Sequence, residues 1–342
     1  MAGITHLVEF QRPGLQALVD LTEEQVEATF ADAYLPTVQV YERTFAYDII
    51  KTNTYIAAYI GYGAEPPYID RDALASKMGT IAYFGLGDVV TYEELQAIHE
   101  ARNNSEKQGV ILAITNKNVK ILDGLRRLMY VAKMECLFKG THTFSKGDGE
   151  KNQITFDFGI PAENKVALTA GNDFEEATFD IIGFLQTHVK AYKDANNGKS
   201  PEVMVTTAEV QALMLRNPNI IVESGRPEGS TRVSVDQLNA VLQSYRLPQI
   251  SILDETSVTY KRNGDNAIVT KELVPKNRIT FLSQGIGEYR QGPTLENNFQ
   301  PGLYLEAEDL RHPIRSVLQG FGAGFPTPEV PSLIYHMDVF TP

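Results

Sequence analysis

Two short runs of residues could do metal chemistry if the fold supplied their partners. Asp157-Phe158-Gly159 is the triplet that holds Mg²⁺ in protein kinases, but the lysine strand and catalytic loop that give it this role do not precede it. His99 and Glu100 would begin a zinc-binding His-Glu-x-x-His helix, but Asn103 occupies the position of the second histidine. Neither run therefore predicts a metal site.

A glycine run near the carboxyl terminus raises the question of a cofactor. Gly320, Gly322 and Gly324 resemble a dinucleotide-binding loop, but Phe325 occupies the region where its last glycine should lie, and no strand–helix unit surrounds the run. The sequence has no phosphate-binding loop and no Gly-x-Ser-x-Gly elbow, and its six histidines share no ligand spacing. We therefore expect no catalytic, cofactor-binding or metal-binding residues. A soluble α+β enzyme whose site is assembled from distant residues stays open as an alternative.

The composition of the 342 residues narrows the class of protein further. Hydrophobic residues make up 43% and charged residues 22% of the chain, which is typical of a globular protein with a substantial core. The net charge of −12 argues against a protein that grips nucleic acid through a basic face. No apolar run approaches the roughly 20 residues of a membrane span. The single cysteine, Cys136, excludes an intrachain disulfide and is expected to be a small buried hydrophobe.

A long helix is the most distinctive element that the sequence predicts. We expect it over residues 106–138, with Ser105 and Gln108 in the spacing of a capping box and Gly140 as its stop. At 1.5 Å per residue this helix would be roughly 50 Å long. A flat subunit that spans a shell needs such a strut more than an enzyme domain does.

Steps of three and four residues along this helix select one apolar stripe. We expect Ile114, Ile121, Leu125 and Leu128 to form its core contacts. The charged residues Arg126 and Lys133 are expected to tolerate substitution far better. The stripe as a whole consists of Ile111, Ile114, Asn118, Ile121, Leu125, Leu128, Ala132 and Glu135.

The rest of the chain mixes helices with antiparallel strands. Capping pairs predict further helices starting at Thr22, Thr91, Asp173, Thr206 and Ser234. Alternating or β-branched segments predict strands, and Asn263-Gly264 predicts a hairpin turn between two of them. Because no regular βαβ rhythm occurs, the fold class is α+β. The predicted strands are 44–50, 55–60, 154–158, 203–205, 250–253, 258–260, 267–269, 278–283, 302–305 and 333–340.

The order of these elements resembles a known family, the tailed-phage major capsid proteins of the lambda type (the gene E family), which have the Hong Kong 97-like fold. The resemblance runs over most of the chain and is strongest in its second half. The segments that carry it are 154–159, 174–185, 247–250 with Asp254 and Tyr260, 279–287, 291–294, 301–309, 324–326 and the last strand up to Phe340.

The resemblance implies a division of the chain by position. Residues 1–43 would be an N-terminal arm and 44–88 an extended β loop that reaches a neighbouring subunit. Residues 89–173 and 301–342 would form a peripheral domain around the spine helix, and 174–300 an axial domain. The alternative within the same fold is the shell protein of an encapsulin-like nanocompartment.

The resemblance also implies function and partners. The chain would be a major capsid protein that assembles with itself into the pentamers and hexamers of an icosahedral shell. This shell would enclose double-stranded DNA without sequence-specific binding, with no cofactor and no membrane. A separate scaffolding protein is implied because no domain-sized segment precedes the arm, and a portal protein and a decoration protein would be further partners. The expected location is the virion, after assembly in the host cytoplasm.

The tip of the extended loop is the expected contact between subunits. The segment 61–70 carries two adjacent prolines, which stiffen it, and tyrosines of the kind that are favoured at interfaces. The residues expected to make this contact are Tyr62, Gly63, Pro66, Pro67 and Tyr68.

Overall fold

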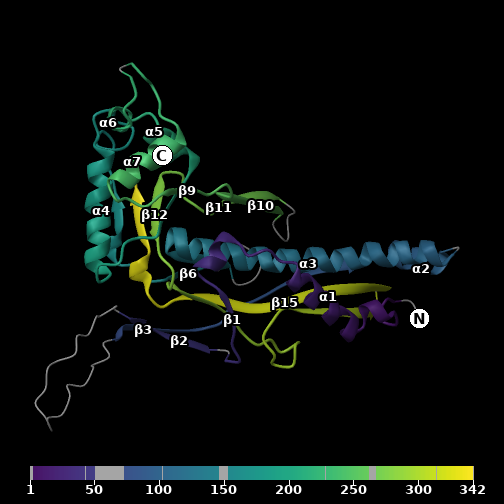
Figure 1. Cartoon of the computed structure of the whole chain (residues 1–342). Helices are drawn as coiled ribbons and strands as arrows, with labels where there is room; N and C mark the ends of the chain where they lie inside the picture. Colours follow the sequence, from purple (N-terminus) through teal and green to yellow (C-terminus); the bar gives the residue numbers. More distant parts are fainter. Residues whose placement is uncertain are drawn as a thin grey trace, which may run out of the picture. The chain divides into compact units, whose positions relative to one another are not determined.

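The computed structural model describes residues 3–42, 44–50, 73–101, 103–145, 153–227, 229–261, 267–312 and 314–341. The chain divides into two compact units (Figure 1). Unit 1 comprises residues 1–46, 78–133 and 288–327, and unit 2 comprises 47–77, 134–287 and 328–342. These units differ from the predicted segments, because residues 134–173 and 328–342 belong to unit 2 and 288–300 to unit 1.

Unit 1 is built on a five-stranded sheet in which the long strand β15 is central. β15 pairs with β14 on one side and with β4 and β13 on the other, and β13 in turn pairs with β1 in parallel. Its strands are β1 (Thr37–Gln39), β4 (Tyr83–Val90), β13 (Gly287–Gln291), β14 (Tyr304–Arg311) and β15 (Ile314–Pro328). Its helical segments are η1 (Val8–Phe10), α1 (Arg12–Glu24), η2 (Phe30–Ala33), α2 (Tyr92–Glu100) and most of α3 (Asn104–Lys139).

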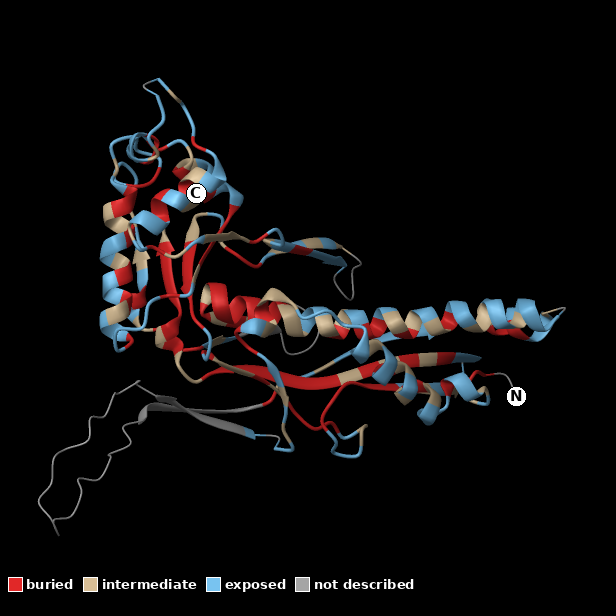
Figure 2. Ribbon diagram, in the orientation of Figure 1, coloured by how far each residue is buried: buried red, intermediate tan, exposed pale blue. Residues whose placement is uncertain are grey.

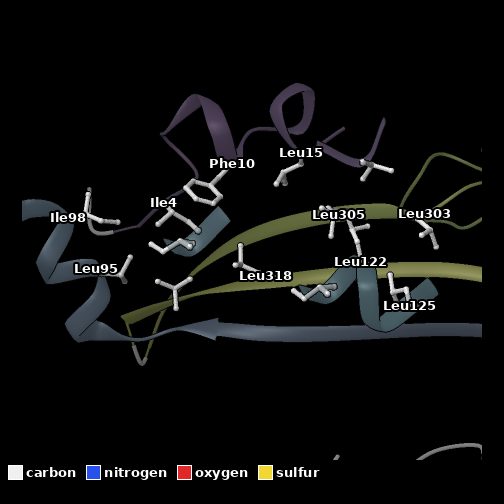
Figure 3. Packing of buried hydrophobic residues seen from close by; sticks show 14 residues of the cluster. Ile4, Phe10, Leu15, Leu95, Ile98, Leu122, Leu125, Leu303, Leu305 and Leu318 are labelled. Atoms are coloured by element: carbon white, nitrogen blue, oxygen red, sulfur yellow. The ribbon is translucent and has the colours of Figure 1, made fainter. Parts of the chain in front are cut away.

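The core of unit 1 joins the N-terminal segment to the sheet and to α3 (Figure 3). Leu122 and Leu125 of α3 belong to the same buried cluster as Leu305 of β14 and Leu318 of β15. Phe10 and the α1 residues complete this cluster at the β14 edge, where α1 lies against the strand. The other members are Ile4, Leu15, Val19, Val90, Leu95, Ile98, Ile114, Ile121 and Leu303.

Asp309 of β14 ties the start of the chain to the sheet. Its carboxylate accepts hydrogen bonds from the backbone N–H groups of Ile4, at 3.0 Å, and Thr5, at 3.2 Å. Ser316 of the neighbouring strand also donates to it, at 2.6 Å. Burial alone would raise the pKa of Asp309, but these hydrogen bonds outweigh burial and hold it below its usual value.

Unit 2 has its own five-stranded sheet in the order β7-β16-β12-β8-β9. Its strands are β7 (Lys165–Ala167), β8 (Val203–Thr206), β9 (Ile250–Ile252), β12 (Arg278–Leu282) and β16 (Tyr335–Asp338). The helical segments of unit 2 are η4 (Ala162–Asn164), α4 (Ile181–Ala195), α5 (Ala208–Met214), α6 (Pro218–Glu223), α7 (Val235–Ser244) and η5 (Pro331–Leu333).

Three two-stranded sheets complete the described strands. β5 (Thr141–Ser145) pairs with β6 (Gln153–Asp157), and β10 (Ser257–Lys261) pairs with β11 (Ile268–Glu272). The latter pair is the hairpin that the Asn263-Gly264 signal predicts, although the turn itself lies outside the described residues. β2 (Thr44–Ile50) pairs with β3 (Ala73–Thr80), and β2 coincides with the first predicted strand.

Several predicted helix starts are confirmed and others are wrong. Thr91 and Ser234 each form the predicted capping box. Asp180 caps α4, which replaces the predicted start at Asp173, and Thr207 caps α5 in place of Thr206. Thr22 lies in the last turn of α1, where its hydroxyl donates to the carbonyl of Leu18 at 2.9 Å. A Thr-x-x-Gln pattern does not distinguish the two ends of a helix, because a threonine hydroxyl can also bond to a carbonyl one turn back.

Candidate interaction surfaces

The predicted contact residues of the loop tip are Tyr62, Gly63, Pro66, Pro67 and Tyr68, and all five lie outside the described residues. Their role stays a prediction from the sequence.

The spine helix α3 begins two residues earlier and ends one residue later than predicted. The side chain of Asn103, and not that of Ser105, accepts the hydrogen bond of the first turn, from the N–H of Glu106 at 2.8 Å. The predicted capping box at Ser105 is therefore wrong. Asparagine is as good an N-cap as serine, so the two start signals could not be ranked from sequence.

Three of the four predicted core residues of α3 are buried, and one is not. Ile114, Ile121 and Leu125 are at most 2% exposed, whereas Leu128 is 43% exposed. The expectation for Leu128 is wrong because a straight helix drifts by about 20° per heptad relative to a seven-residue step. Met129 packs against the cluster in place of Leu128.

The helix lies close to β15 because that strand carries glycines. A Cβ atom at Gly320 would lie 2.4 Å from Cγ2 of Ile121 and 3.0 Å from Cδ1 of Leu125. At Gly322 it would lie 2.8 Å from Cδ2 of Leu303. Of the glycines that resemble a nucleotide loop, Gly320 thus lies under α3, and a side chain there would push the helix outward.

Lys133 of α3 is a buried charged residue, although the sequence predicted that it would tolerate substitution. It is 3% exposed, and its ammonium group pairs with Asp32 and donates to Thr37 Oγ1 at 2.7 Å. The ammonium also lies 5.1 Å from the ring centre of Tyr289. Burial lowers the pKa of Lys133 and Asp32 opposes this effect. Burial and the ion pair with Asp32 argue against the expectation that Lys133 tolerates substitution.

Glu135 of α3 organises a second charged cluster, within unit 2. It is 3% exposed and accepts from Nδ1 of His142 at 2.8 Å, while the ammonium groups of Lys271 and Lys139 lie 3.1 and 3.2 Å away. Burial opposes ionisation, but the His142 hydrogen bond and the two lysines outweigh it and lower the pKa of Glu135 to about 2. The cluster anchors β11 and β5 to the last turns of the helix.

The carbonyl groups at the end of α3 are satisfied by β12 and β16. Nη1 of Arg278 donates to the carbonyl of Phe138 at 2.7 Å, and Nε2–H of His336 donates to that of Leu137 at 2.8 Å. The N–H of Gly140 donates to the carbonyl of Glu135 at 3.0 Å, with Gly140 at φ 70°. The glycine stop is confirmed, and two long-range side chains complete it.

Exposed apolar side chains gather on unit 1 more than on unit 2. Figure 2 shows that β15 and the last turns of α3 are largely buried, whereas the first turns of α3 are largely exposed. In the part of the chain whose side chains are described, the exposed large hydrophobic residues of unit 2 are Val222, Val235, Tyr260 and Ile268. Those of unit 1 are Val8, Leu21, Val26, Tyr41, Tyr83, Val89, Tyr92, Leu112, Leu128, Leu295, Phe299 and Ile314. These residues are spread over several elements of unit 1, and singly scattered exposed apolar side chains are common on protein surfaces.

The residues of the two motifs considered for metal chemistry have structural roles in the fold. Asp157 ends β6 and its carboxylate accepts from the N–H of Gly159 at 2.9 Å, which forms a tight turn. His99 lies in the last turn of α2. Within the described ranges, no group of three histidine, cysteine or acidic residues could hold a metal ion. No described helix is long and apolar enough to span a membrane.

The comparison with protein families identifies one family. The family model described as phage major capsid protein E matches residues 17–297. No curated protein matches the sequence significantly.

Two solved structures share the fold at low sequence identity. A protein described as a prophage capsid protein of Escherichia coli CFT073 aligns with a TM-score of 0.57 at 12% identity, over 98% of this chain and 99% of the other. A phage-related protein of Bordetella bronchiseptica RB50 aligns with a TM-score of 0.51 at 10% identity, over 94% and 96% of the two chains.

Proposed function

The chain belongs to the phage major capsid protein E family, and from this premise we propose how its parts build a phage head. As a major capsid protein with the Hong Kong 97-like fold, it assembles with copies of itself into an icosahedral shell that is part of the virion. The family match favours a phage head over the encapsulin-like shell and over a soluble enzyme. The observation that carries this conclusion is the match to one family over residues 17–297, which includes α3 and most of both units.

The segments of the chain take the roles that the family resemblance gives them. Residues 1–43 act as the N-terminal arm and 44–88 as the extended loop, while 89–173 and 301–342 form the peripheral domain and 174–300 the axial domain. In support of this division, a long helix lies on a sheet in unit 1, which suits a thin plate, and α4 to α7 belong to unit 2 together with a separate sheet. The axial domain would surround the centres of pentamers and hexamers.

The loop tip makes contacts between subunits. An isolated two-stranded hairpin such as β2–β3 buries too little surface to be stable alone, so its extension gains stability by lying on a neighbour. Deletion of residues 61–70 should leave a folded subunit that does not close shells. Tyr62→Ser with Tyr68→Ser should act in the same direction, whereas Tyr260→Ser, on the exposed β10, should not. Loss of subunit folding in the deletion variant would place the tip in a core instead.

The remaining partners follow from the same role. A separate scaffolding protein would guide assembly in the host cytoplasm, a portal protein would occupy one vertex, and a decoration protein would reinforce the outer surface. The negative net charge suits an inner surface that confines DNA without binding its phosphates.

Electron microscopy and sedimentation test the function directly. The full chain, produced together with its scaffolding protein, should form closed icosahedral particles that sediment far faster than a 38.0 kDa subunit. Discrete dimers or tetramers under the same conditions would contradict the proposal.

A further inference from the structure

A small pocket at one end of the unit 1 sheet contains unpaired polar atoms. It has a volume of about 250 Å³, below the roughly 300 Å³ at which sites for drug-sized ligands begin, so it suits a single side chain. It lies between β4 and the segment that follows β13. Its lining includes Ile81, Tyr83, Thr294, Leu295, Glu296 and Ala323.

Two oxygen atoms of this pocket are buried without a partner among the described residues. Thr294 is 2% exposed and its Oγ1 makes no hydrogen bond. Oε2 of Glu296 is also buried and unpaired, although the Tyr83 hydroxyl hydrogen-bonds to the same carboxylate. Burial first, and then Glu296 and the nearby Glu306, raise the pKa of Tyr83. A buried acceptor without a donor is costly, so the pocket is suited to a cationic or N–H donor.

The rim of the pocket is apolar and exposed. Tyr83 is 55% and Leu295 57% exposed, and the Tyr83 ring stacks on Phe321 at a centroid distance of 5.9 Å. An acidic floor with an apolar rim favours a cation that is accompanied by an aliphatic neighbour.

The opposite end of the same sheet carries such a pair. Arg311 and Ile314 are directly opposed residues at the tip of the β14–β15 hairpin, so their side chains lie on one face. Both are exposed, and Arg311 makes no ion pair within the described part of the chain. Arg315 pairs with Leu310 and thus points to the other face.

The pocket and the Arg311–Ile314 pair lie at opposite ends of the sheet and cannot meet within one subunit. Ile314 and Ala323 are nine residues apart on β15, which corresponds to about 30 Å at 3.3 Å per residue. An Arg311 and Ile314 pair that fills this pocket must therefore come from a different molecule.

We propose that Arg311 and Ile314 of one copy of this chain dock into the Tyr83–Glu296 pocket of a second copy. This inference rests on the proposed function, since it names one contact of the shell. Arg311 would pair with the Glu296 carboxylate while Ile314 covers Leu295. The contact is head-to-tail, and head-to-tail contacts generate rings when their rotation closes.

Charge reversal tests the pair. Glu296→Arg and Arg311→Glu should each lower the yield of particles at least tenfold, and the two substitutions in one chain should restore most of that yield. Arg315→Glu, at the same tip but on the other face, should leave the yield within about twofold of wild type. Normal assembly of both single variants would overturn the proposal, and so would failure of the double variant to recover while circular dichroism shows it folded.

Crosslinking tests the same contact without requiring closed particles. Cys136 is the only native cysteine and is buried, so chains with Leu295→Cys and chains with Ile314→Cys can be mixed and treated with a short bis-maleimide. A mixed dimer that forms only when both variants are present is expected. Leu295→Cys mixed with Val222→Cys, an exposed position of unit 2, is the control and should give none.

The two outcomes separate this contact from the proposed function. Absence of the mixed dimer overturns the contact even if wild-type chains form particles. Its presence supports the contact even if wild-type chains form none, in which case only the proposed function fails.

Discussion

The guanidinium group of Arg278 donates to both carboxylate oxygens of Asp338, from Nε at 2.7 Å and from Nη2 at 2.8 Å. The two residues are cross-strand partners of β12 and β16, so the sheet register places the fork opposite the carboxylate. The remaining nitrogen reaches the carbonyl of Phe138. One side chain therefore joins the unit 2 sheet to the end of the spine helix.

Arg278→Lys should lower the free energy of unfolding by about 1–3 kcal/mol, because lysine cannot donate to two carboxylate oxygens and a carbonyl in this planar arrangement. Chemical denaturation followed by circular dichroism measures the change. Arg226→Lys, at an exposed arginine that donates to Gln237, is the control and should change stability by less than about 0.5 kcal/mol. Equal losses in the two variants would show that the fork to Asp338 contributes nothing.

Leu125→Ala should cost about 2–5 kcal/mol, because it removes a buried side chain that packs over Gly320. Leu128→Ala, less than one turn further along the same helix, should cost under about 1 kcal/mol, because Leu128 is largely exposed. Thermal unfolding of the two variants provides the comparison. A larger loss for Leu128→Ala would mean that α3 buries a different face.

Lys133→Met should destabilise the subunit by about 3 kcal/mol, because it leaves the Asp32 carboxylate without its ammonium partner. Arg127→Met, at an exposed position of the same helix, is the matched control. Adding Asp32→Asn to Lys133→Met should recover part of the loss, since no unpaired charge then remains. If the double variant is less stable than Lys133→Met, the ion pair is not the source of the effect.

Acidification should destabilise unit 2 through His336. Burial is the main cause that lowers the pKa of His336 to about 3, from an ordinary value near 6.5. Between pH 6.5 and 3 the unfolded state therefore binds a proton at His336 that the folded state does not. The contribution of the neutral His336 to folding stability is complete above pH 6.5 and is lost as the pH falls. The free energy of unfolding should drop by about 2 kcal/mol between pH 7 and 5.

His336→Gln should remove most of this pH dependence, because glutamine can still donate to the Leu137 carbonyl but does not titrate. Denaturation curves at pH 7, 6 and 5 for both proteins measure the difference. Parallel curves for the two proteins over this range would refute the assignment to His336.

Local signals in the sequence determined where many elements lie. The capping residues Thr91 and Ser234 each satisfy the N–H groups of their own helix, so a four-residue pattern is enough to identify them. The Asn263-Gly264 signal and the strands beside it depend on neighbours only a few residues away. The α+β class, the long helix and the family resemblance rest on such local patterns and on their order.

Only the tertiary structure decided where the buried face of α3 ends and what surrounds it. β15 was not predicted, because its glycines have low strand propensity, yet a glycine is needed at position 320, where Ile121 and Leu125 approach. Lys133 looks like an ordinary surface residue until Asp32, about 100 positions away, is brought beside it. Burial and ion pairing depend on residues far apart in the chain, and a helix whose period is close to but not equal to 3.5 carries Leu128 out of the stripe that its spacing predicts.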